Sequence, residues 1–230
     1  MHLLIDNGFT LREITKRLDI SFKDIRAVLL THEHTDHLDG VGAVSRPYGI
    51  PVHLPSALTR VCEEKLVDCE IVPHFDKPFS VDGVEITPFR VPHDARYTVG
   101  YKLVKGEESF AILTDVGQMR PSIWENVKGV NTVFLESNYD ESMLIGGAYP
   151  EALKKRIMGT LGHLSNEDSA KVTESLIKEG TKKIILGHLS ENNNAPEIAF
   201  SVTAKTIEKS GFSLGEIYLG VAEQNKVKIF

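Results

Sequence analysis

Short apolar runs alternate with longer amphipathic stretches along the chain, and this alternation is the first guide to its fold. Each short run is rich in β-branched residues and is closed by a polar residue, a pattern that is typical of buried strands. The strands predicted in this way cover residues 3–6, 27–32, 110–116, 130–137 and 182–188. Histidines and aspartates stand at the ends of these strands.

Antiparallel pairing is predicted at two places. Asp82-Gly83 lies between two alternating runs, and this dipeptide favours a two-residue hairpin turn. Residues 101–106 are predicted to pair with residues 107–115 in the same way. The sheet structure is therefore expected to be mixed rather than purely parallel.

Helices are predicted where apolar residues recur at helical spacing between the strands. The helical stretches are 10–18, 37–48, 56–65, 150–158, 165–179 and 195–210. Thr10 is the expected cap of the first helix, and Ser165-x-x-Asp168 forms a capping box at a later one. Strands of both kinds with helices between them predict an α/β fold with two mixed sheets, each covered by helices on its outer side.

Composition places the chain among ordinary globular proteins. It has 230 residues, of which 41% are hydrophobic and 25% charged, and neither a linker nor a repeat interrupts it, so we expect a single domain over residues 1–230. No apolar run approaches the roughly 18 residues of a membrane span, and the amino terminus lacks signal-peptide features. This predicts no membrane partner and a cytoplasmic location. Cys62 and Cys69 are too few for a disulfide framework or a four-thiolate zinc site.

The richest chemistry follows the second predicted strand, where residues 31–40 read THEHTDHLDG. His32 and His34 stand two apart in extended chain and point the same way, while Asp36 and His37 enter the next helix and can face the same point. Imidazole and carboxylate are donors that zinc, manganese and iron accept, although a histidine-rich polar loop without a metal is the alternative. Three further strand ends offer complementary ligands, namely His93, Asp115 and His188.

The HEHTDH sequence resembles the H-x-H-x-D-H signature of the metallo-β-lactamase fold, and the three later ligands follow in the order usual for that fold. The resemblance implies a four-layer αββα sandwich with a dinuclear metal site on one edge. It gives the first metal to His32, His34 and His93, the second to Asp36, His37 and His188, and makes Asp115 the bridging ligand. The metals implied are two divalent cations, zinc first, with manganese or iron as alternatives. Such a pair can share one water, lower its pKa and clamp both oxygens of a displacement.

Four further segments resemble the YycJ/WalJ branch, whose members are single-domain bacterial proteins viewed as exonuclease-like metallohydrolases. The segments are ESNYD at 136–140, YPEALKKRI at 149–157, GHLSNEDSA at 162–170 and GHLSENNN at 187–194. This narrower resemblance implies a nucleic-acid substrate, DNA or RNA ends, and hydrolysis of phosphodiester bonds. Asp36 and His163 are the residues that we expect to act in catalysis.

A basic run precedes His163 and could hold a phosphate backbone. Lys154, Lys155 and Arg156 are the expected substrate contacts, together with His163, whose place ahead of a helix cap suits an anion. A solvated helix face is the alternative for the basic run, and a hydrogen-bonded structural histidine is the alternative for His163. The formal net charge of −6 disfavours nonspecific coating of nucleic acid but says nothing about a local cationic site.

Two residues are expected to support the site from behind the metal ligands. Asp6 closes the first predicted strand and resembles the aspartate that ties down the ligand loop in this fold, although a plain turn would also explain it. Tyr139 stands where the branch would have a histidine, and a phenol is a poor base at neutral pH. Relatives in this branch also usually begin with an additional strand and a Ser/Gly-rich turn, so we expect the first sheet to lack its usual first strand.

Three functions are compatible with these residues. The first is a dinuclear metal-dependent phosphodiesterase, most of all an exonuclease-like enzyme. The second is an acyl hydrolase of the glyoxalase II, lactonase or lactamase type, which would need a single oxyanion site and a shaped apolar pocket instead of cationic groups. The third is a regulatory protein that retains the metal site. The basic run and His163 favour the phosphodiesterase, whereas the full ligand set argues against the regulatory protein because structural sites need only four ligands.

Overall fold

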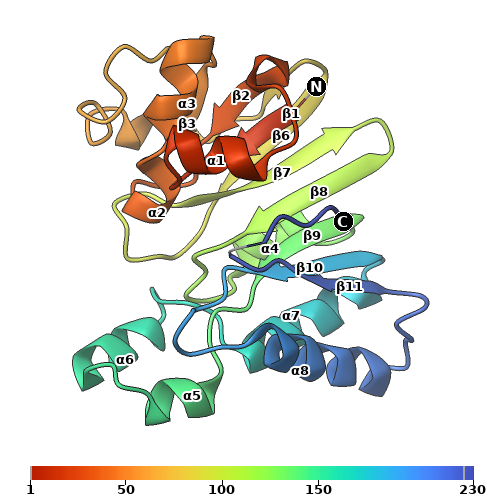
Figure 1. Ribbon diagram of the computed structural model, residues 1–230. Coiled ribbons are helices and arrows are strands. Elements are labelled where there is room, and N and C mark those ends of the chain that lie inside the picture. Colours follow the sequence, from red (N-terminus) through yellow and green to blue (C-terminus); the bar gives the residue numbers. More distant parts are fainter. Residues whose placement is uncertain (1, 225) are drawn as a thin grey trace. The chain divides into compact units, whose positions relative to one another are not determined.

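The computed structural model describes residues 2–224 and 226–230, and these form two compact units (Figure 1). Unit 1 consists of Met1–Arg90 and Ala95–Tyr101, and unit 2 consists of Val91–Asp94 and Lys102–Phe230. Strand β7 (Val99–Lys105) passes from the first unit into the second. The expectation of a single domain over residues 1–230 stays a prediction.

Unit 1 contains a parallel four-stranded sheet. Its strand order is β1 (His2–Ile5), β2 (Ile25–Leu29), β3 (Val52–Pro55) and β4 (Ile71–His74). Its helices are α1 (Leu11–Arg17), α2 (Thr35–Leu38) and α3 (Val41–Tyr48), with short 3₁₀ turns at η1 (Phe22–Asp24) and η2 (Ser56–Leu58). Parallel strands are buried on both faces and therefore read as continuous apolar runs, and the uninterrupted burial from Ala27 to Leu30 follows this rule.

The core of unit 1 lies between this sheet and its helices. Ile14 from α1, Val44 from α3 and Leu58 from η2 pack into one cluster with the inward residues of β2 and β3. Thr10 caps α1 as predicted: its hydroxyl accepts from the backbone N–H of Glu13, and the Glu13 carboxylate accepts in return from the backbone N–H of Thr10. This capping box fixes the start of the helix that covers the sheet.

The predicted hairpin is confirmed. Strands β5 (Phe79–Val81) and β6 (Val84–Arg90) pair antiparallel, with Val81 opposite Val84. Asp82 and Gly83 both have positive φ, 46° and 77°, which is the conformation that a type I′ turn requires.

Unit 2 is built on four parallel strands. They are β8 (Glu108–Leu113), β9 (Thr132–Glu136), β10 (Lys183–Gly187) and β11 (Tyr218–Val221), each paired with the next. The helices are α4 (Pro121–Val127), α5 (Glu141–Gly146), α6 (Glu151–Ile157), α7 (Asn166–Lys178) and α8 (Pro196–Lys209). Helices α7 and α8 pack against each other, and α8 also contacts β11 (Figure 1).

The second sheet of the protein has the strand order β11-β10-β9-β8-β7-β6-β5. This sheet combines parallel and antiparallel pairs, and the first sheet is separate, so the predicted α/β class with two sheets is confirmed. The prediction that both sheets are mixed is wrong for the first sheet, in which β1, β2, β3 and β4 all pair parallel. No helix in the described part of the chain has the length and apolar character that crossing a bilayer requires.

Two predicted helices differ from the structure. The stretch 37–48 is interrupted at Asp39-Gly40, where the Gly40 N–H donates to the Asn7 carbonyl oxygen instead of to a carbonyl of the preceding helical turn. The stretch 56–65 forms one 3₁₀ turn followed by separate turns, in keeping with the low helix propensity of β-branched Thr59 and Val61. Helices α4 and α5 were not predicted, although Pro121 at the first turn of α4 is a usual start signal.

A buried histidine of unit 1 lies behind the loop that follows β2. The His74 Nε2 lies 3.0 Å from the hydroxyl of Tyr101, and that hydroxyl donates to the Leu30 carbonyl oxygen at 2.7 Å. Since the single phenolic proton goes to Leu30, His74 must donate from Nε2. Burial lowers the pKa of His74 to about 4, so the imidazole is neutral near pH 7.

This histidine should make unit 1 sensitive to acid. The neutral form is favoured in the folded state, so the cost of protonation is absent above about pH 6.5 and grows as the pH falls towards 4. We expect His74→Gln, which keeps an N–H donor for Tyr101, to lose less stability than the parent over this range, by about 3 kcal/mol at the lower end. Urea unfolding at a series of pH values measures the difference. Parallel pH profiles for the two proteins would contradict the assignment.

Candidate metal centre

Residues expected to bind or to support the metals stand where parallel strands end. Within unit 1, Asp6 follows β1 and His32 follows β2; within unit 2, Asp115 follows β8 and His188 follows β10. Asp6, Asp115 and His188 have φ of 54°, 59° and 56°, a left-handed conformation that is uncommon outside glycine. Such backbone strain gathers at functional sites, where the chain must turn a side chain to a required position.

Asp6 anchors the loop after β2. Its Oδ1 accepts from the backbone N–H of Thr31 at 2.7 Å, and its Oδ2 accepts from the Thr31 hydroxyl at 2.7 Å. The same Oδ2 lies 2.8 Å from Nδ1 of His37. One carboxylate thus binds both the start of the histidine loop and a side chain of α2, which are the contacts expected of a residue that ties down the ligand loop.

These bonds also set which ring nitrogen of each histidine carries a proton. The Thr31 hydroxyl gives its proton to Asp6, so it accepts from Nδ1 of His32, 2.9 Å away. His37 donates from Nδ1 to Asp6 directly. Both imidazoles therefore present the lone pair of Nε2, the form in which a histidine binds a metal ion.

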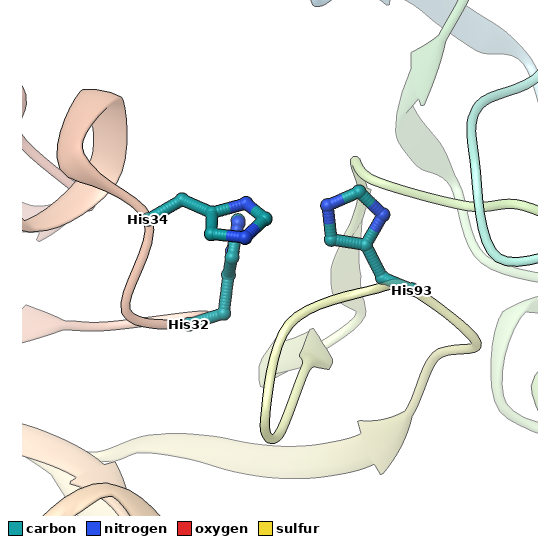
Figure 2. A group of neighbouring side chains, drawn as sticks. All are labelled: His32, His34 and His93. Atoms are coloured by element: carbon teal, nitrogen blue, oxygen red, sulfur yellow. The ribbon is translucent and has the colours of Figure 1, made fainter. Parts of the chain in front are cut away.

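Three imidazoles of unit 1 gather beside this loop. The ring of His32 lies 4.6 Å from that of His34 and 4.2 Å from that of His37, measured between centroids. Figure 2 shows His32 and His34 projecting from the same loop, and their rings meet edge to face. The Asp36 carboxylate is exposed and lies 3.5 Å from Nε2 of His37. Within unit 1, His32 therefore lies beside both His34 and His37, and Asp36 lies beside His37.

Unit 2 is organised around Glu136, which is completely buried at the end of β9. Its Oε1 accepts from Nδ1 of His188 at 2.7 Å, from Nδ1 of His163 at 2.9 Å and from the backbone N–H of Asp115 at 3.1 Å. Its Oε2 accepts from the backbone N–H groups of Val116 and Leu164. The ends of β8, β9 and β10 are thereby bound to one carboxylate.

The charge on Glu136 is stabilised strongly. Burial alone would raise its pKa, but His163 and His188, with their hydrogen bonds, outweigh burial and bring the pKa to about 2. The reciprocal effect appears on His163, where burial would lower the pKa and Glu136 raises it overall. With Nδ1 donated to Glu136, both histidines direct Nε2 away from the carboxylate.

His93 lies in the loop after β6, in the short segment that belongs to unit 2 (Figure 2). Its Nδ1 donates to the Gly162 carbonyl oxygen at 3.2 Å, so its lone pair is on Nε2, 3.3 Å from Oδ1 of Asp115. Burial lowers the pKa of His93 and favours the neutral ring. Within unit 2, the ligand atoms of Asp115, Glu136, His163 and His188 also lie within 4.8 Å of one another.

A network of asparagines holds the segment after Glu136. The Asn194 amide donates to the Ser137 carbonyl oxygen at 2.8 Å and to Oδ1 of Asn166 at 2.9 Å. Asn138 donates to the His188 carbonyl oxygen at 2.8 Å. Since all three amides are satisfied inside the protein, the ESN segment and the loop after β10 are fixed together.

The three basic residues expected to contact substrate have different surroundings. Lys154 is buried, and its ammonium donates to the Ile145 carbonyl oxygen at 2.7 Å, so it stabilises the α5–α6 connection. Arg156 forms an ion pair with Asp94, the neighbour of His93, and remains mostly exposed. Lys155 is exposed. The run is therefore not one basic face, and Lys154 is the member whose surroundings contradict a substrate contact.

Tyr139, three residues after Glu136 in the chain, is buried. Burial, followed by the nearby carboxylates of Asp168 and Glu141, raises its pKa to about 12. The phenol therefore keeps its proton at neutral pH, as expected for a group that cannot act as a base there.

Glu136 is the residue of the site that the sequence analysis did not identify. Its signal was present, because it is a charged residue closing an apolar run directly between the strands that end at Asp115 and His188. A carboxylate at that position is costly to bury unless several donors meet it. The rule that strand-end polar residues gather at one edge could have found it.

Comparison with known proteins agrees with this architecture. The family described as the beta-lactamase superfamily domain matches residues 2–189, which includes parts of both units. "Exodeoxyribonuclease YycJ" of Bacillus anthracis is 31% identical over 94% of this chain and 84% of its own length. "Exodeoxyribonuclease WalJ" of Streptococcus pneumoniae serotype 2 is 35% identical over 93% of this chain and 82% of its own length.

Solved structures show the same fold at lower identity. Zn²⁺-bound PqqB from Methylobacterium extorquens superposes with a TM-score of 0.68, covering 96% of this chain and 81% of that protein at 18% identity. At this identity the likeness extends to the fold alone. Together with the family match over residues 2–189 and a TM-score of 0.65 to the metallo-beta-lactamase fold protein YhfI from Bacillus subtilis, this confirms the metallo-β-lactamase fold implied by the HEHTDH signature.

Removing the charge of Glu136 should be visible in a neighbouring histidine. We expect Glu136→Gln to lower the pKa of His163, because the carboxylate is what raises it, and to reduce the free energy of unfolding by about 3 kcal/mol. NMR titration of the histidine ring protons in metal-depleted protein measures the pKa. Glu174→Gln, a partly exposed carboxylate on α7 that pairs with Lys178, is the control. An unchanged His163 titration in Glu136→Gln would show that the pair is not electrostatically coupled.

Proposed function

Because the chain belongs to the metallo-β-lactamase superfamily and to its YycJ/WalJ branch, we propose that it is a metal-dependent phosphodiesterase that acts on nucleic acid as an exonuclease. The observation that carries this proposal is the similarity to two exodeoxyribonucleases over nearly the whole chain, at 31% and 35% identity. The match is not confined to a metal motif, so it favours nucleases over the acyl hydrolases that share the fold.

The proposed ligands are those expected from the superfamily signature. One divalent cation is assigned to His32, His34 and His93, a second to Asp36, His37 and His188, and Asp115 bridges them. Zinc is the first choice of metal, with manganese or iron as alternatives, because imidazole and carboxylate ligands suit all three. The two compact units are proposed to act as one metallo-β-lactamase-like domain over residues 1–230. A cytoplasmic location belongs to the same proposal because the nucleic-acid substrate is found there.

The histidines fit a metal centre because each presents an unprotonated ring nitrogen. His32 and His37 donate from Nδ1 to Thr31 and Asp6, and His93 donates to the Gly162 carbonyl oxygen. Each of these histidines thus offers Nε2 as a neutral ligand, with the outer hydrogen bond that metal-binding histidines usually have. Bound divalent cations would supply Lewis acidity and a water of lowered pKa.

The protein's own groups have separate tasks in this proposal. Asp6 and Glu136 hold imidazoles in one tautomer and one orientation, which removes the cost of ordering them during the reaction. His163, one-fifth exposed and charged more readily because of Glu136, can donate from Nε2 to a phosphate oxygen. Asp36 is proposed to act in catalysis together with His163. Tyr139 is proposed to support the site as a buried phenol that keeps its proton at neutral pH.

The substrate contacts proposed are Lys155 and Arg156, with His163. Arg156 is bound to Asp94 through Nε, which leaves the two terminal nitrogens of the guanidinium for an incoming phosphate. Lys155 is the neighbouring exposed cation on α6. These groups would contact the phosphate backbone of the nucleic acid. Since the phosphates carry no sequence information, such contacts would not depend on the base sequence.

Asp115→Ala tests the bridging ligand. Two cations close together repel each other, and losing the shared carboxylate should lower the metal content from two per chain towards one or none. Elemental analysis of purified protein gives the content, and circular dichroism controls for folding. Two tightly retained metals in Asp115→Ala would remove this residue from the bridging position.

Substrate binding is tested by separating His163 from the basic residues. His163→Ala should keep its metal and lower turnover on single-stranded DNA by about 10²-fold, the scale of one lost transition-state donor. The double change of Lys155 and Arg156 to Ala should instead weaken binding and reduce the slope of log affinity against log salt by roughly 0.7 per lost contact. Lys205→Ala, an exposed lysine of α8, is the matched control.

The same preparation distinguishes the acyl-hydrolase alternative. A protein with two metals that cleaves a thioester and leaves both DNA and RNA ends intact would overturn the nuclease proposal. If the rate of DNA cleavage and the affinity for DNA are unchanged both in His163→Ala and in the double variant of Lys155 and Arg156, these side chains do not contact the substrate.

A further inference from the structure

The turn after β1 packs against the backbone of helix α2. A side chain added at Gly8 would place its Cβ 2.2 Å from the carbonyl oxygen of Asp36, 2.6 Å from the carbonyl carbon and 2.8 Å from the Cα of the same residue. All three are main-chain atoms, which cannot move aside as the tip of a side chain can. A residue with a side chain at position 8 would therefore have to displace α2 by about 1 Å to restore ordinary packing distances.

The same turn is hydrogen-bonded to the C-terminal end of α2. The backbone N–H of Asn7 donates to the His37 carbonyl oxygen at 2.7 Å, and the Asn7 carbonyl oxygen accepts from the backbone N–H of Gly40 at 2.8 Å. The buried Asn7 side chain closes the turn, since its amide donates to the Phe9 carbonyl oxygen and its Oδ1 accepts from the Phe9 N–H, both at 3.1 Å. We call residues 7–9 the Asn7-Gly8 turn.

Helix α2 depends on contacts outside itself. It has four residues, and its N-cap residue, His34, makes no side-chain capping bond. A helix of this length is not stable on its own. The Asp36 side chain is 68% exposed, so packing around the carboxylate does not fix its direction. The position of Asp36 is therefore set by where the backbone of α2 lies, and the Asn7-Gly8 turn is in contact with that backbone.

We propose that the Asn7-Gly8 turn positions Asp36 for the second cation, with Gly8 as the positioning residue. The inference rests on the proposed function, in which Asp36 and His37 belong to the second cation, and deepens it by naming a residue that is not itself a metal ligand. The backbone conformation of Gly8 does not call for glycine, because its φ lies outside the left-handed region. The close approach to Asp36 is what excludes a side chain there.

Zinc content tests this assignment. The purified protein is dialysed against a series of free zinc concentrations, and elemental analysis gives the zinc bound per chain at each one. We expect Gly8→Ala to keep the first cation, at His32, His34 and His93, with the affinity of the parent. The second cation should bind about 10- to 100-fold more weakly, the usual effect of losing a contact that orients a metal ligand. Gly146→Ala is the matched control, because a Cβ there meets nothing within 4 Å.

Asn7→Ala gives a second reading without adding an atom to the turn. It removes both side-chain bonds to Phe9 and should weaken the second cation about tenfold. This variant decides the question if circular dichroism shows that Gly8→Ala does not fold. Parent affinity for the second cation in a folded Gly8→Ala, or in Asn7→Ala where Gly8→Ala does not fold, would overturn the proposal. Equal weakening of both cations would also overturn it, because the turn would then support the fold in general rather than Asp36.

The parent protein distinguishes failure of this inference from failure of the proposed function. If the parent and a folded Gly8→Ala bind two zinc ions with the same affinities and both cleave single-stranded DNA, the turn has no positioning role and the nuclease proposal stands. If the parent retains fewer than two cations, with zinc and with manganese alike, the dinuclear site of the proposed function is wrong and this inference is wrong with it.

Discussion

The buried carboxylate of Glu136 is the interaction on which unit 2 depends. It takes hydrogen bonds from His163, His188 and three backbone N–H groups, so the loops after β8 and β10 and the segment before α7 all converge on one charge. An ionised group in the interior is tolerated only when donors surround it, and a pKa of about 2 shows how completely these donors favour the anion. The positions of the site residues follow from satisfying Glu136.

In unit 1, the Asp6 carboxylate at the end of β1 has the role that Glu136 has in unit 2. Asp6 takes the backbone N–H and hydroxyl of Thr31 together with the imidazole of His37. In each unit, then, an acidic residue at a strand end fixes the tautomer of histidines that come from a different part of the chain. This arrangement also explains the left-handed backbone at Asp6, Asp115 and His188, because the hydrogen bonds over-determine a conformation that would otherwise cost of order 1 kcal/mol or more.

The local features of the fold could be predicted from the sequence because they depend on neighbours in the chain. The Thr10 cap and the Asp82-Gly83 turn are of this kind, and so is the grouping of His32, His34 and His37. Features that depend on distant residues could not. The break at Gly40 accompanies its hydrogen bond to the Asn7 carbonyl oxygen, and the burial of Lys154 accompanies its hydrogen bond to the Ile145 carbonyl oxygen. The place of Glu136 at a strand end marks it as a candidate site residue, but its five donors come from distant residues and cannot be read from its neighbours in the sequence.

An overall negative charge and a nucleic-acid substrate are compatible because ionic screening limits how far each charge acts. At physiological ionic strength the screening length is about 8 Å, so a phosphate responds to the cations beside it rather than to the total of −6. The basic side chains differ accordingly. The buried ammonium of Lys154 donates to a carbonyl oxygen of the protein and cannot reach a substrate. Arg156 forms an ion pair with Asp94 but is still exposed, so it can contact a phosphate. Which cations can serve a substrate is therefore decided by their surroundings, and a count of basic residues along the sequence cannot supply that distinction.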